Sequence, residues 1–582
     1  MVNGSRHRVG SGAHVRWYHN LIVAGCLLWY VGCGAYQLSL PGLEYDETIF
    51  GPPARGHTQD FLTGVATVAP DSPARFSPLA FTPFVLRIGS YQVPVMVMPY
   101  QGAFKVHVLA AIFSLWGVSP WTLRWPNIVV GGLTLLLFFF LLRRVCSPGI
   151  ALLALALLAT DPSYLFYTRH DFNPSAWLLL LVLAPLWCLV RGYDSAGRRW
   201  GWWAAAFFLF GFGVYTRLDY LWFLAALGLT GLLWGWRHRG VQVRKKEIVW
   251  AMVCFVGGCS PYLLFVWQRP TIARSILPLA VPAQELSAVL PVKGYVLWTV
   301  LNGTSLLDFF AARSGVNLGK EVTPEGEVRV GSYVAARQQL PLSSLFSGTL
   351  TPLVVLLLVG VCCRLRPPPL LQVLMLFLLA LLLGVGGVGG ALRGHHFVVF
   401  LPFVQMFLAV GLGRMWQHSS TWLGRGAWGL VGGACIAANL LMVVRYHTFL
   451  AATGGRGVWS EAIYALTAYL EERCHTQRCL LGDWGLGTQI VTLATRPLQV
   501  EEVFWPYIYG ASEAEAETLV CSPGALFVFY SDRYSNFSRP KQLFFAAAQR
   551  CRASATTERV FVERDGTPVI EVIAFSGREK EE

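Results

Sequence analysis

The sequence has 582 residues, of which 54% are hydrophobic and only 13% are charged, and its mean hydropathy is +0.50. A soluble domain is usually about 25% charged, and a disordered chain is poor in aromatic residues, whereas this one has 36 Phe, 22 Trp and 21 Tyr. The composition therefore excludes a disordered chain and a single soluble globule, and it indicates many membrane spans.

The formal net charge of +14 is unevenly distributed along the chain. Residues 1–444 hold 32 Lys and Arg against 15 Asp and Glu, whereas residues 445–582 hold 14 against 17. The excess of cations therefore belongs to the apolar part, where it fits short cytoplasmic loops under the positive-inside rule. This distribution argues against a nucleic-acid groove, so we expect no nucleic-acid partner.

A helix that crosses the bilayer needs about 20 apolar residues. About eleven such segments occur, at Trp17–Leu40, Trp121–Leu142, Gly149–Tyr167, Trp177–Val190, Trp200–Tyr215, Leu218–Trp236, Ile248–Trp267, Leu350–Cys363, Leu370–Val388, Phe397–Leu412 and Trp428–Val444. Residues 102–117 are apolar but short and carry Lys105 and His107, so we expect an interfacial helix there.

The basic clusters give the direction of the spans. They follow the even-numbered segments, as Arg143 and Arg144 follow the second, so a cytoplasmic N-terminus places them all on the cytoplasmic side. The odd count then places the C-terminal part outside. We predict an all-α polytopic membrane bundle over residues 1–444, in a bacterial plasma membrane, with long outer loops at about 41–120 and 268–348, and a small C-terminal extracytoplasmic α/β domain over residues 445–582.

The C-terminal part alternates helical and strand-like patterns. We predict helices at 460–473, 488–494, 512–520 and 539–550, strands at 479–482, 497–504 and 525–530, and a hairpin over 558–575 that turns at Asp565-Gly566. Its four cysteines could form two disulfides, with Cys474–Cys479 closing a short loop. Their spacing fits no zinc pattern, and Gly485-Leu486-Gly487 lacks the third glycine of a dinucleotide loop.

The sequence EYDET, from Glu44 to Thr48, directly follows the first span. Adjacent carboxylates at a bilayer surface are costly unless they are solvated, paired or used in chemistry. Several cations emerge on the same outer face, namely Arg75, Lys105, Arg124, Arg169, Arg217 and Arg393. We therefore expect any chemistry to take place at the outer membrane surface, although a hydrated loop start would also explain the acids.

The order of these motifs resembles that of GT-C superfamily glycosyltransferases, specifically family 39, which includes protein O-mannosyltransferases and lipid A aminoarabinose transferases. Asp46-Glu47 resembles the family's acidic pair after the first span. The other matching segments are PYQGAFK (99–105), GVSPWTLRWP (117–126), ATDPSYLFYTRHD (159–171), YTRL (215–218) and RGHHFVVFLP (393–402). In the last of these, Phe397 replaces the family's tyrosine and one residue is missing before the proline. The resemblance covers most of residues 17–444, and the C-terminal part carries no diagnostic motif.

The resemblance implies a GT-C type fold and the transfer of a sugar from a polyprenyl-phosphate donor to an acceptor outside the cytoplasm, with inversion and without a nucleotide sugar. Asp46 would be the general base and Glu47 an orienting group. Arg169, Arg217, Arg393 and Lys105 would bind the donor phosphate, because guanidinium groups hold phosphates bidentately. Further site candidates are Glu44, Arg124, Asp171 and His396. His57 and Asp60 are candidates of second rank. No motif indicates a metal or another cofactor.

Other interpretations of these residues stay open. Arg169 could pair with Asp171, Arg217 could pair with Asp219, Lys105 could anchor the interfacial helix, and His395-His396 could be interfacial histidines. A transporter or flippase of lipid-linked sugars is the alternative function, although the spans lack the internal acids it would need. A non-catalytic scaffold is a third. For a glycosyltransferase, the expected partners are the lipid-linked donor, membrane lipids, and a lipid, glycan or protein acceptor.

Overall fold

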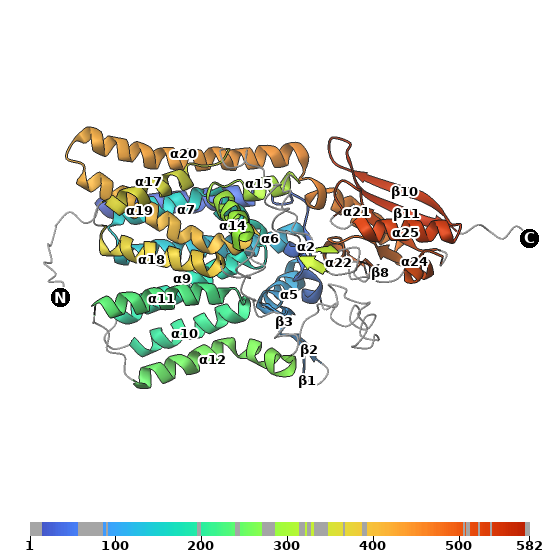
Figure 1. Ribbon diagram of the computed structural model, residues 1–582, viewed down its shortest axis with the longest axis horizontal. Coiled ribbons are helices and arrows are strands. Elements are labelled where there is room, and N and C mark those ends of the chain that lie inside the picture. The colour runs from blue at the N-terminus through green and yellow to red at the C-terminus, as the bar shows by residue number, and fades with distance from the viewer. Residues whose placement is uncertain are drawn as a thin grey trace, which may run out of the picture.

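The computed structural model describes residues 14–55, 85–88, 91–194, 199–238, 245–270, 286–312, 320–322, 328–330, 347–364, 367–386, 393–496, 498–504, 507, 513–521, 524–535 and 538–576. The molecule is elongated, with a bundle of long helices at one end of its long axis and a smaller domain of strands and short helices at the other (Figure 1). The predicted fold class, a polytopic helical bundle with a small C-terminal α/β domain, is confirmed.

Helices occur at each of the eleven predicted spans. The long helices of the bundle are α1 (His14–Ala35), α6 (Pro120–Val145), α7 (Pro148–Thr160), α8 (Pro162–His170), α9 (Ser175–Asp194), α10 (Arg199–Thr216), α11 (Tyr220–His238), α12 (Lys245–Gln268), α17 (Thr351–Arg364), α18 (Pro369–Gly386), α19 (Leu401–His418) and α20 (Trp422–Thr453). Within the described residues, six helices are long and apolar enough to cross a membrane, or seven if α7 and α8 form one bent span. The chain is thus a multi-pass membrane protein.

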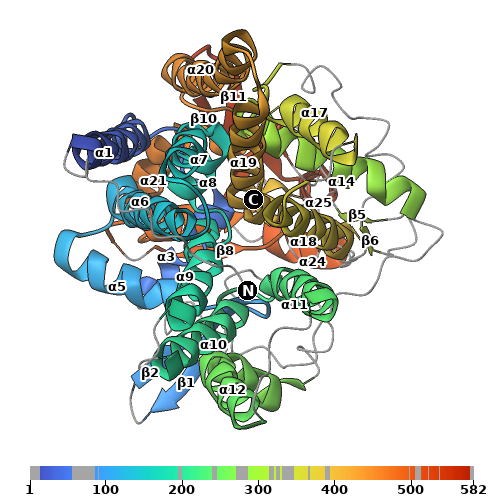
Figure 2. The same cartoon turned by 90° about the vertical axis from the view of Figure 1, so that its left-hand side faces the viewer.

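The break between α7 and α8 bends the chain by 58°. Pro162 lacks the N–H that would continue the helix, and Asp161 caps α8 by accepting a hydrogen bond from the backbone N–H of Tyr164 at 2.9 Å. Seen end on in Figure 2, α7, α8 and α19 lie toward the centre of the bundle, and α1, α12, α17 and α20 lie at its periphery. The central position of α8 brings its last residues to the end of the bundle that meets the C-terminal domain.

Short elements cover this domain-facing end. They are α2 (Tyr45–Thr48), α3 (Gly51–Ala54), the hairpins β1 (Val85–Ile88) with β2 (Tyr91–Pro94) and β3 (Met96–Met98) with β4 (Gln101–Gly102), α5 (Phe104–Trp116), α15 (Ser305–Phe310), and the hairpin β5 (Lys320–Val322) with β6 (Val328–Val330). The helix α14 (Leu286–Leu301) packs against α17 and α18 of the bundle. The helix expected at 102–117 is α5, and its last turn exposes Leu115 and Trp116. Two 3-10 turns, η3 (Gly394–His396) and η4 (Val398–Phe400), precede α19.

The C-terminal domain is built on a five-stranded sheet with the strand order β10-β11-β9-β7-β8, in which β7 runs parallel to both β8 and β9. Its elements are the turn η5 (Gly457–Trp459), α21 (Ala462–Arg473), β7 (Cys479–Leu481), α22 (Gly487–Leu493), β8 (Val500–Glu502), α24 (Glu513–Val520), β9 (Leu526–Tyr530), α25 (Ser538–Arg550), β10 (Ser554–Val562) and β11 (Pro568–Ser576). Every helix, strand and hairpin predicted for this part is confirmed, with ends that differ by a few residues.

The strands β7 and β9 of this sheet are buried on both faces, whereas the edge strand β10 is largely exposed. On one face Leu526, Val528 and Tyr530 of β9 pack with α21 and α22, and on the other Phe527 and Phe529 pack with α24 and α25. This alternation is the two-residue period of a strand, and it makes the domain a three-layer α/β structure. The helix α20 continues past Val444 to Thr453, so it crosses the boundary that we expected at 444 and carries the chain directly into the domain.

Two disulfides close loops in this domain. Cys474–Cys479 spans 5 residues, as expected from the sequence, and Cys521–Cys551 spans 30 and ties the end of α24 to the end of α25. Because the larger loop restricts the unfolded chain more, we expect loss of Cys521–Cys551 to cost about 3–4 kcal/mol and loss of Cys474–Cys479 about 2 kcal/mol. Thermal unfolding of the two Cys→Ser pairs checks this; an equal or reversed effect would contradict it.

Candidate active site

The acidic motif lies at the junction of the helical bundle and the C-terminal domain. Glu44 is the N-cap of α2, and its carboxylate accepts a hydrogen bond from the backbone N–H of Asp46 at 2.7 Å. On the other side of α2, the Thr48 and Thr488 hydroxyls lie 2.9 Å apart, which joins this short helix to α22. A four-residue helix cannot hold its shape alone, so its position depends on these contacts.

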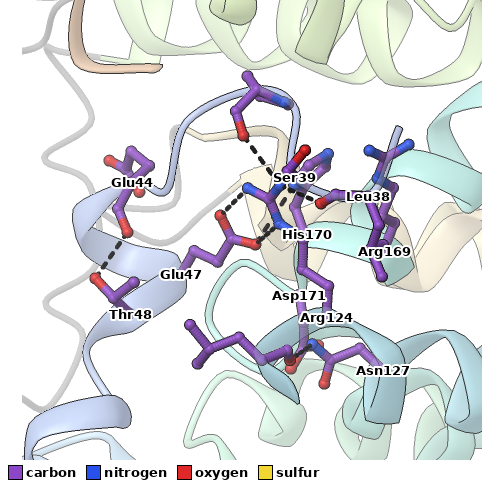
Figure 3. Close-up of polar contacts among 12 residues, drawn as sticks. Leu38, Ser39, Glu44, Glu47, Thr48, Arg124, Asn127, Arg169, His170 and Asp171 are labelled. Atoms are coloured by element: carbon purple, nitrogen blue, oxygen red, sulfur yellow. Dashed lines mark hydrogen bonds and ion pairs between the residues drawn. The ribbon is translucent and has the colours of Figure 1, made fainter. Parts of the chain in front are cut away.

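Glu47 points into the protein and forms a bidentate ion pair with Arg124 of α6 (Figure 3). The two N–O distances are 2.5 and 2.8 Å, and both side chains are buried. Arg124 also donates to the carbonyls of Leu38 and Pro41, at 2.7 and 2.9 Å. Burial alone would raise the pKa of Glu47, but the charge and hydrogen bonds of Arg124 lower it to about 2. Glu47 is therefore an anion that fixes the turn after α1.

Arg169 fixes the same turn from α8. Its guanidinium is fully buried and donates to the carbonyls of Tyr36, at 3.0 Å, of Gln37, and of Leu40, at 2.5 Å. These carbonyls follow the end of α1, where helical partners are lacking. The hydrogen-bond partners of Arg169 in the structure are therefore backbone carbonyls, whereas the Asp171 carboxylate that the sequence offered as a partner pairs with Lys105.

Lys105 and Asp171 form a second buried ion pair, with an N–O distance of 2.6 Å. Asp171 ends α8 in the left-handed conformation, and its other oxygen accepts a hydrogen bond from the N–H of Ala176 at 2.6 Å. Burial raises the pKa of Asp171, which Lys105 opposes. The Lys105 ammonium also lies 5.0 Å from the centre of the Phe50 ring. This pair ties α5 to the start of α9 and leaves Lys105 with little access to solvent.

Asp46 and Arg393 form an ion pair that faces solvent. The carboxylate and guanidinium lie 3.1 Å apart, and their side chains are 13% and 46% exposed, respectively. The guanidinium carbon lies 5.9 Å from the ring centre of Phe309 and 5.8 Å from that of Trp484. Burial raises the pKa of Asp46, and the charges of Arg393 and His396 oppose that rise. A carboxylate in this position can accept a proton from a group that approaches from solvent.

Arg217, Asp219 and His396 lie next to this pair. Arg217 binds both oxygens of Asp219 and donates to the carbonyl of Asn173 at 2.6 Å, and the Nδ1 atom of His396 lies 3.0 Å from Asp219. Burial alone would raise the pKa of Asp219, but Arg217 and His396 lower it to about 2. The predicted Arg217–Asp219 contact is thus present.

Tyr100 lies between the two groups of charges and is 39% exposed. Burial raises the pKa of its hydroxyl and the charges of Asp46 and Asp219 add to that rise, whereas Arg217 and Arg393 oppose it. The hydroxyl is therefore a neutral hydrogen-bond donor that is close to both ion pairs. We did not predict a role for Tyr100, although it belongs to the PYQGAFK segment that the resemblance identified.

The structure thus divides the predicted residues into two layers. Asp46, Arg393 and His396 gather at the junction surface, whereas the others are buried beneath or beside it, namely Glu44, Glu47, Lys105, Arg124, Arg169, Asp171 and Arg217. His57 and Asp60 lie outside the described residues. Asp219, Tyr100 and Trp484 were not among the predicted site residues. Its position two residues after Arg217 in the sequence could have indicated that Asp219 belongs to the site. Within the described part of the chain, no group of three or more His, Cys, Asp or Glu is arranged to hold a metal ion.

Comparisons with known proteins give the fold a family context. Residues 104–265 match the model of the dolichyl-phosphate-mannose-protein mannosyltransferase family. No curated protein sequence matches the chain significantly.

Among solved structures, ArnT from Cupriavidus metallidurans bound to undecaprenyl phosphate is 14% identical, with a TM-score of 0.53 over 96% of this chain and 98% of that one. The apo oligosaccharyltransferase of Archaeoglobus fulgidus is 12% identical, with a TM-score of 0.53 over 94% and 70%. The oligosaccharyltransferase AglB of the same organism, in complex with an inhibitory peptide and a dolichol-phosphate, is 11% identical, with a TM-score of 0.52 over 98% and 75%.

The solved structures establish the fold, and the family model covers the segment from α5 to α12. The expected resemblance to GT-C superfamily glycosyltransferases is confirmed: the chain is a multi-pass membrane protein with the GT-C glycosyltransferase fold.

Proposed function

We propose that the protein is a membrane glycosyltransferase that moves a sugar from a polyprenyl-phosphate donor to an acceptor outside the cytoplasm. The observation that carries this proposal is the Asp46–Arg393 pair, which places a carboxylate with a raised pKa and an exposed guanidinium side by side at one end of the bundle. A base and a phosphate-binding cation are the two groups that such a transfer needs when no metal takes part.

In this proposal Asp46 removes the proton of the acceptor hydroxyl or amine as that atom attacks the anomeric carbon. The bond between the anomeric carbon and the phosphate oxygen breaks, its electron pair stays with the phosphate, and polyprenyl phosphate leaves. Direct attack inverts the anomeric centre. Arg393, which is half exposed, binds the leaving phosphate, and Tyr100 and His396 supply further hydrogen bonds beside it.

The buried cations take a different part in the proposal. Arg217 donates hydrogen bonds to both oxygens of Asp219, which also contacts His396. We therefore propose that Arg217 holds Asp219 and His396 in place. Arg124 and Arg169 shape the turn that leads to Asp46, and Lys105 with Asp171 supports it from α5. We assign Glu47 an orienting role, because its carboxylate is buried and its charge is balanced by Arg124.

Membrane sidedness is part of the same proposal. The ends of α6 and α9 that carry Arg143, Arg144 and Arg191 are remote from the site residues, and they would face the cytoplasm. The site and the C-terminal domain would then lie outside. ArnT and AglB have been solved with undecaprenyl phosphate and with a dolichol-phosphate, respectively, and an acyclic lipid phosphate of this kind is the donor carrier that we propose here.

The test is to supply the purified protein, in lipid nanodiscs with a chelator, with either a polyprenyl-phosphate sugar or the matching nucleotide sugar. We expect release of polyprenyl phosphate only from the first. Arg393→Ala should weaken undecaprenyl phosphate binding by about 10- to 100-fold, the value of one charge-assisted contact of 1.5–3 kcal/mol. Arg144→Ala, which breaks an exposed ion pair with Asp194, is the control and should not change binding. Use of the nucleotide sugar, or unchanged binding in Arg393→Ala, would overturn the proposal.

A further inference from the structure

Trp484 belongs to the C-terminal domain but lies in the site. It follows β7, in the turn that leads into α22, at the carboxyl ends of the parallel strands. In α/β sheets this edge is where ligand-contacting loops gather. The half-buried indole lies 5.1 Å from the ring of Tyr45, the residue directly before Asp46. The turn therefore reaches the base proposed above from the opposite end of the sequence.

Two aromatic rings lie near the Arg393 guanidinium. Among the described side chains, the guanidinium of Arg393 donates a hydrogen bond to Asp46 at 3.1 Å and lies near the rings of Phe309 of α15 and Trp484. Its side chain is 46% exposed, and a long exposed side chain has considerable rotamer freedom. Two aromatic rings near the guanidinium reduce that freedom and attract the cation through their faces.

The turn that carries Trp484 is itself held firmly. The buried Asp483 carboxylate accepts a hydrogen bond from the N–H of Trp484 at 2.8 Å, and the Tyr530 hydroxyl donates to the carbonyl of Gly485 at 3.0 Å. Gly485 has φ of +94°, a conformation that disfavours a side chain. The ring is therefore placed by the core of the C-terminal domain.

This domain is also fixed to α2 and α3, the elements around Asp46. Besides the contact between Thr48 and Thr488, Arg55 donates to the carbonyls of Val491 and Thr492 at 2.7 and 3.0 Å. These carbonyls end α22, where helical partners are lacking. Trp484 and Asp46 therefore share one rigid frame, although the residues between them in sequence form the whole bundle.

We infer that Trp484 is a positioning residue that holds the Arg393 guanidinium against Asp46, so that the C-terminal domain completes the catalytic site. The inference rests on the proposed function, because it concerns the same phosphate-binding cation. Without the indole ring, the Arg393 side chain can turn away from Asp46 toward solvent. Both phosphate binding and the environment of the base then change.

The experiment compares Trp484→Leu with the conservative Trp484→Phe. We expect Trp484→Leu to weaken undecaprenyl phosphate binding by about fivefold to tenfold, the range that a contact of about 1 kcal/mol gives, and Trp484→Phe to retain most of it. The acid limb of the pH–rate profile should move to higher pH in Trp484→Leu, because Arg393 no longer opposes the raised pKa of Asp46. Within the described residues, the other titratable groups near this carboxylate stay in place, namely His396, Glu44, Tyr45 and Tyr100.

A matched control comes from the same domain. Tyr469 of α21 also lies against guanidinium groups, with Arg473 and Arg559 each 5.7 Å from its ring centre. Tyr469→Leu removes an aromatic–arginine contact of the same kind and should leave phosphate binding and the pH profile unchanged.

A double-mutant cycle gives the deciding result. In the Arg393→Ala background, Trp484→Leu should have little further effect on binding, because its partner is already absent. An equal loss in both backgrounds, or a Trp484→Leu variant that loses activity without a shift in the pH profile, would make Trp484 a structural residue only and overturn the inference. Absence of transfer from any lipid-linked donor by the wild type would instead reject the proposed function, because the cycle measures lipid phosphate binding without transfer.

Discussion

Asp46→Asn should reduce sugar transfer by about 10²- to 10⁴-fold, the usual contribution of a positioned general base. Asparagine has nearly the same shape as aspartate but cannot accept the proton at neutral pH. Binding of undecaprenyl phosphate should persist or become tighter, because Arg393 is then released from its anionic partner. Transfer and lipid binding measured on the same preparation separate loss of the base from loss of the site.

Two further variants make this result specific. Asp194→Asn removes an acid whose side chain is 37% exposed and pairs with Arg144, and it should leave transfer unchanged. Glu44 is buried beside Asp46, and burial followed by the charge of Asp46 raises its pKa. Glu44→Gln keeps a side-chain oxygen that can accept the hydrogen bond from the Asp46 N–H. Full activity of Asp46→Asn, or a larger loss in Glu44→Gln, would remove Asp46 from the role of base.

The second large effect concerns stability. Glu47→Gln leaves the buried Arg124 guanidinium without its counter-ion, and removal of one partner from a buried pair costs about 3–5 kcal/mol. The thermal unfolding temperature in detergent should therefore drop clearly. Arg124→Met combined with Glu47→Leu removes both charges and should recover part of the loss, because the desolvation cost of the ions disappears with them. A double variant that is less stable than Glu47→Gln would contradict this account.

The same pair predicts a pH dependence. The pKa of Glu47 is about 2 in the folded protein, against about 4.3 for an unperturbed glutamate. Because the folded value is the lower one, the ionised pair stabilises the protein fully above about pH 5, and this contribution decreases as the pH falls toward 2. The difference in unfolding temperature between wild type and Glu47→Gln should accordingly shrink on acidification. A difference that stays constant from pH 7 to pH 3 would argue that hydrogen bonding alone accounts for the effect.

Local sequence patterns were sufficient for the fold. Apolar runs marked the long helices, since length and hydropathy decide whether a helix can span a bilayer. In the C-terminal domain the helical period of Ile463, Leu466 and Leu470 and the Asp565-Gly566 turn each identified an element that the structure contains. The break at Asp161–Pro162 was missed, and one bent pair stands where we expected a single span.

The roles of the arginines could not be predicted in the same way. Arg169 and Arg393 both occur at helix ends in family-like motifs, yet Arg169 binds carbonyls more than 120 residues away and Arg393 stays half exposed. Whether a guanidinium meets backbone carbonyls or solvent depends on tertiary packing between distant segments. The position of Trp484 next to Arg393 has the same origin, and no local pattern distinguishes it from the other 21 tryptophans.

The contact between α2 and α22 has a consequence for biosynthesis. The Thr48 and Thr488 hydroxyls are separated by 440 positions in the sequence, so the helix that carries Asp46 leaves the translocation machinery long before the segment that secures it. Nascent chains with a fully inserted bundle would still lack an ordered Asp46 and a seated Arg393. If the proposed function holds, the pair of charges that it needs is completed only after the segment that carries Thr488 has been translated and has folded against α2.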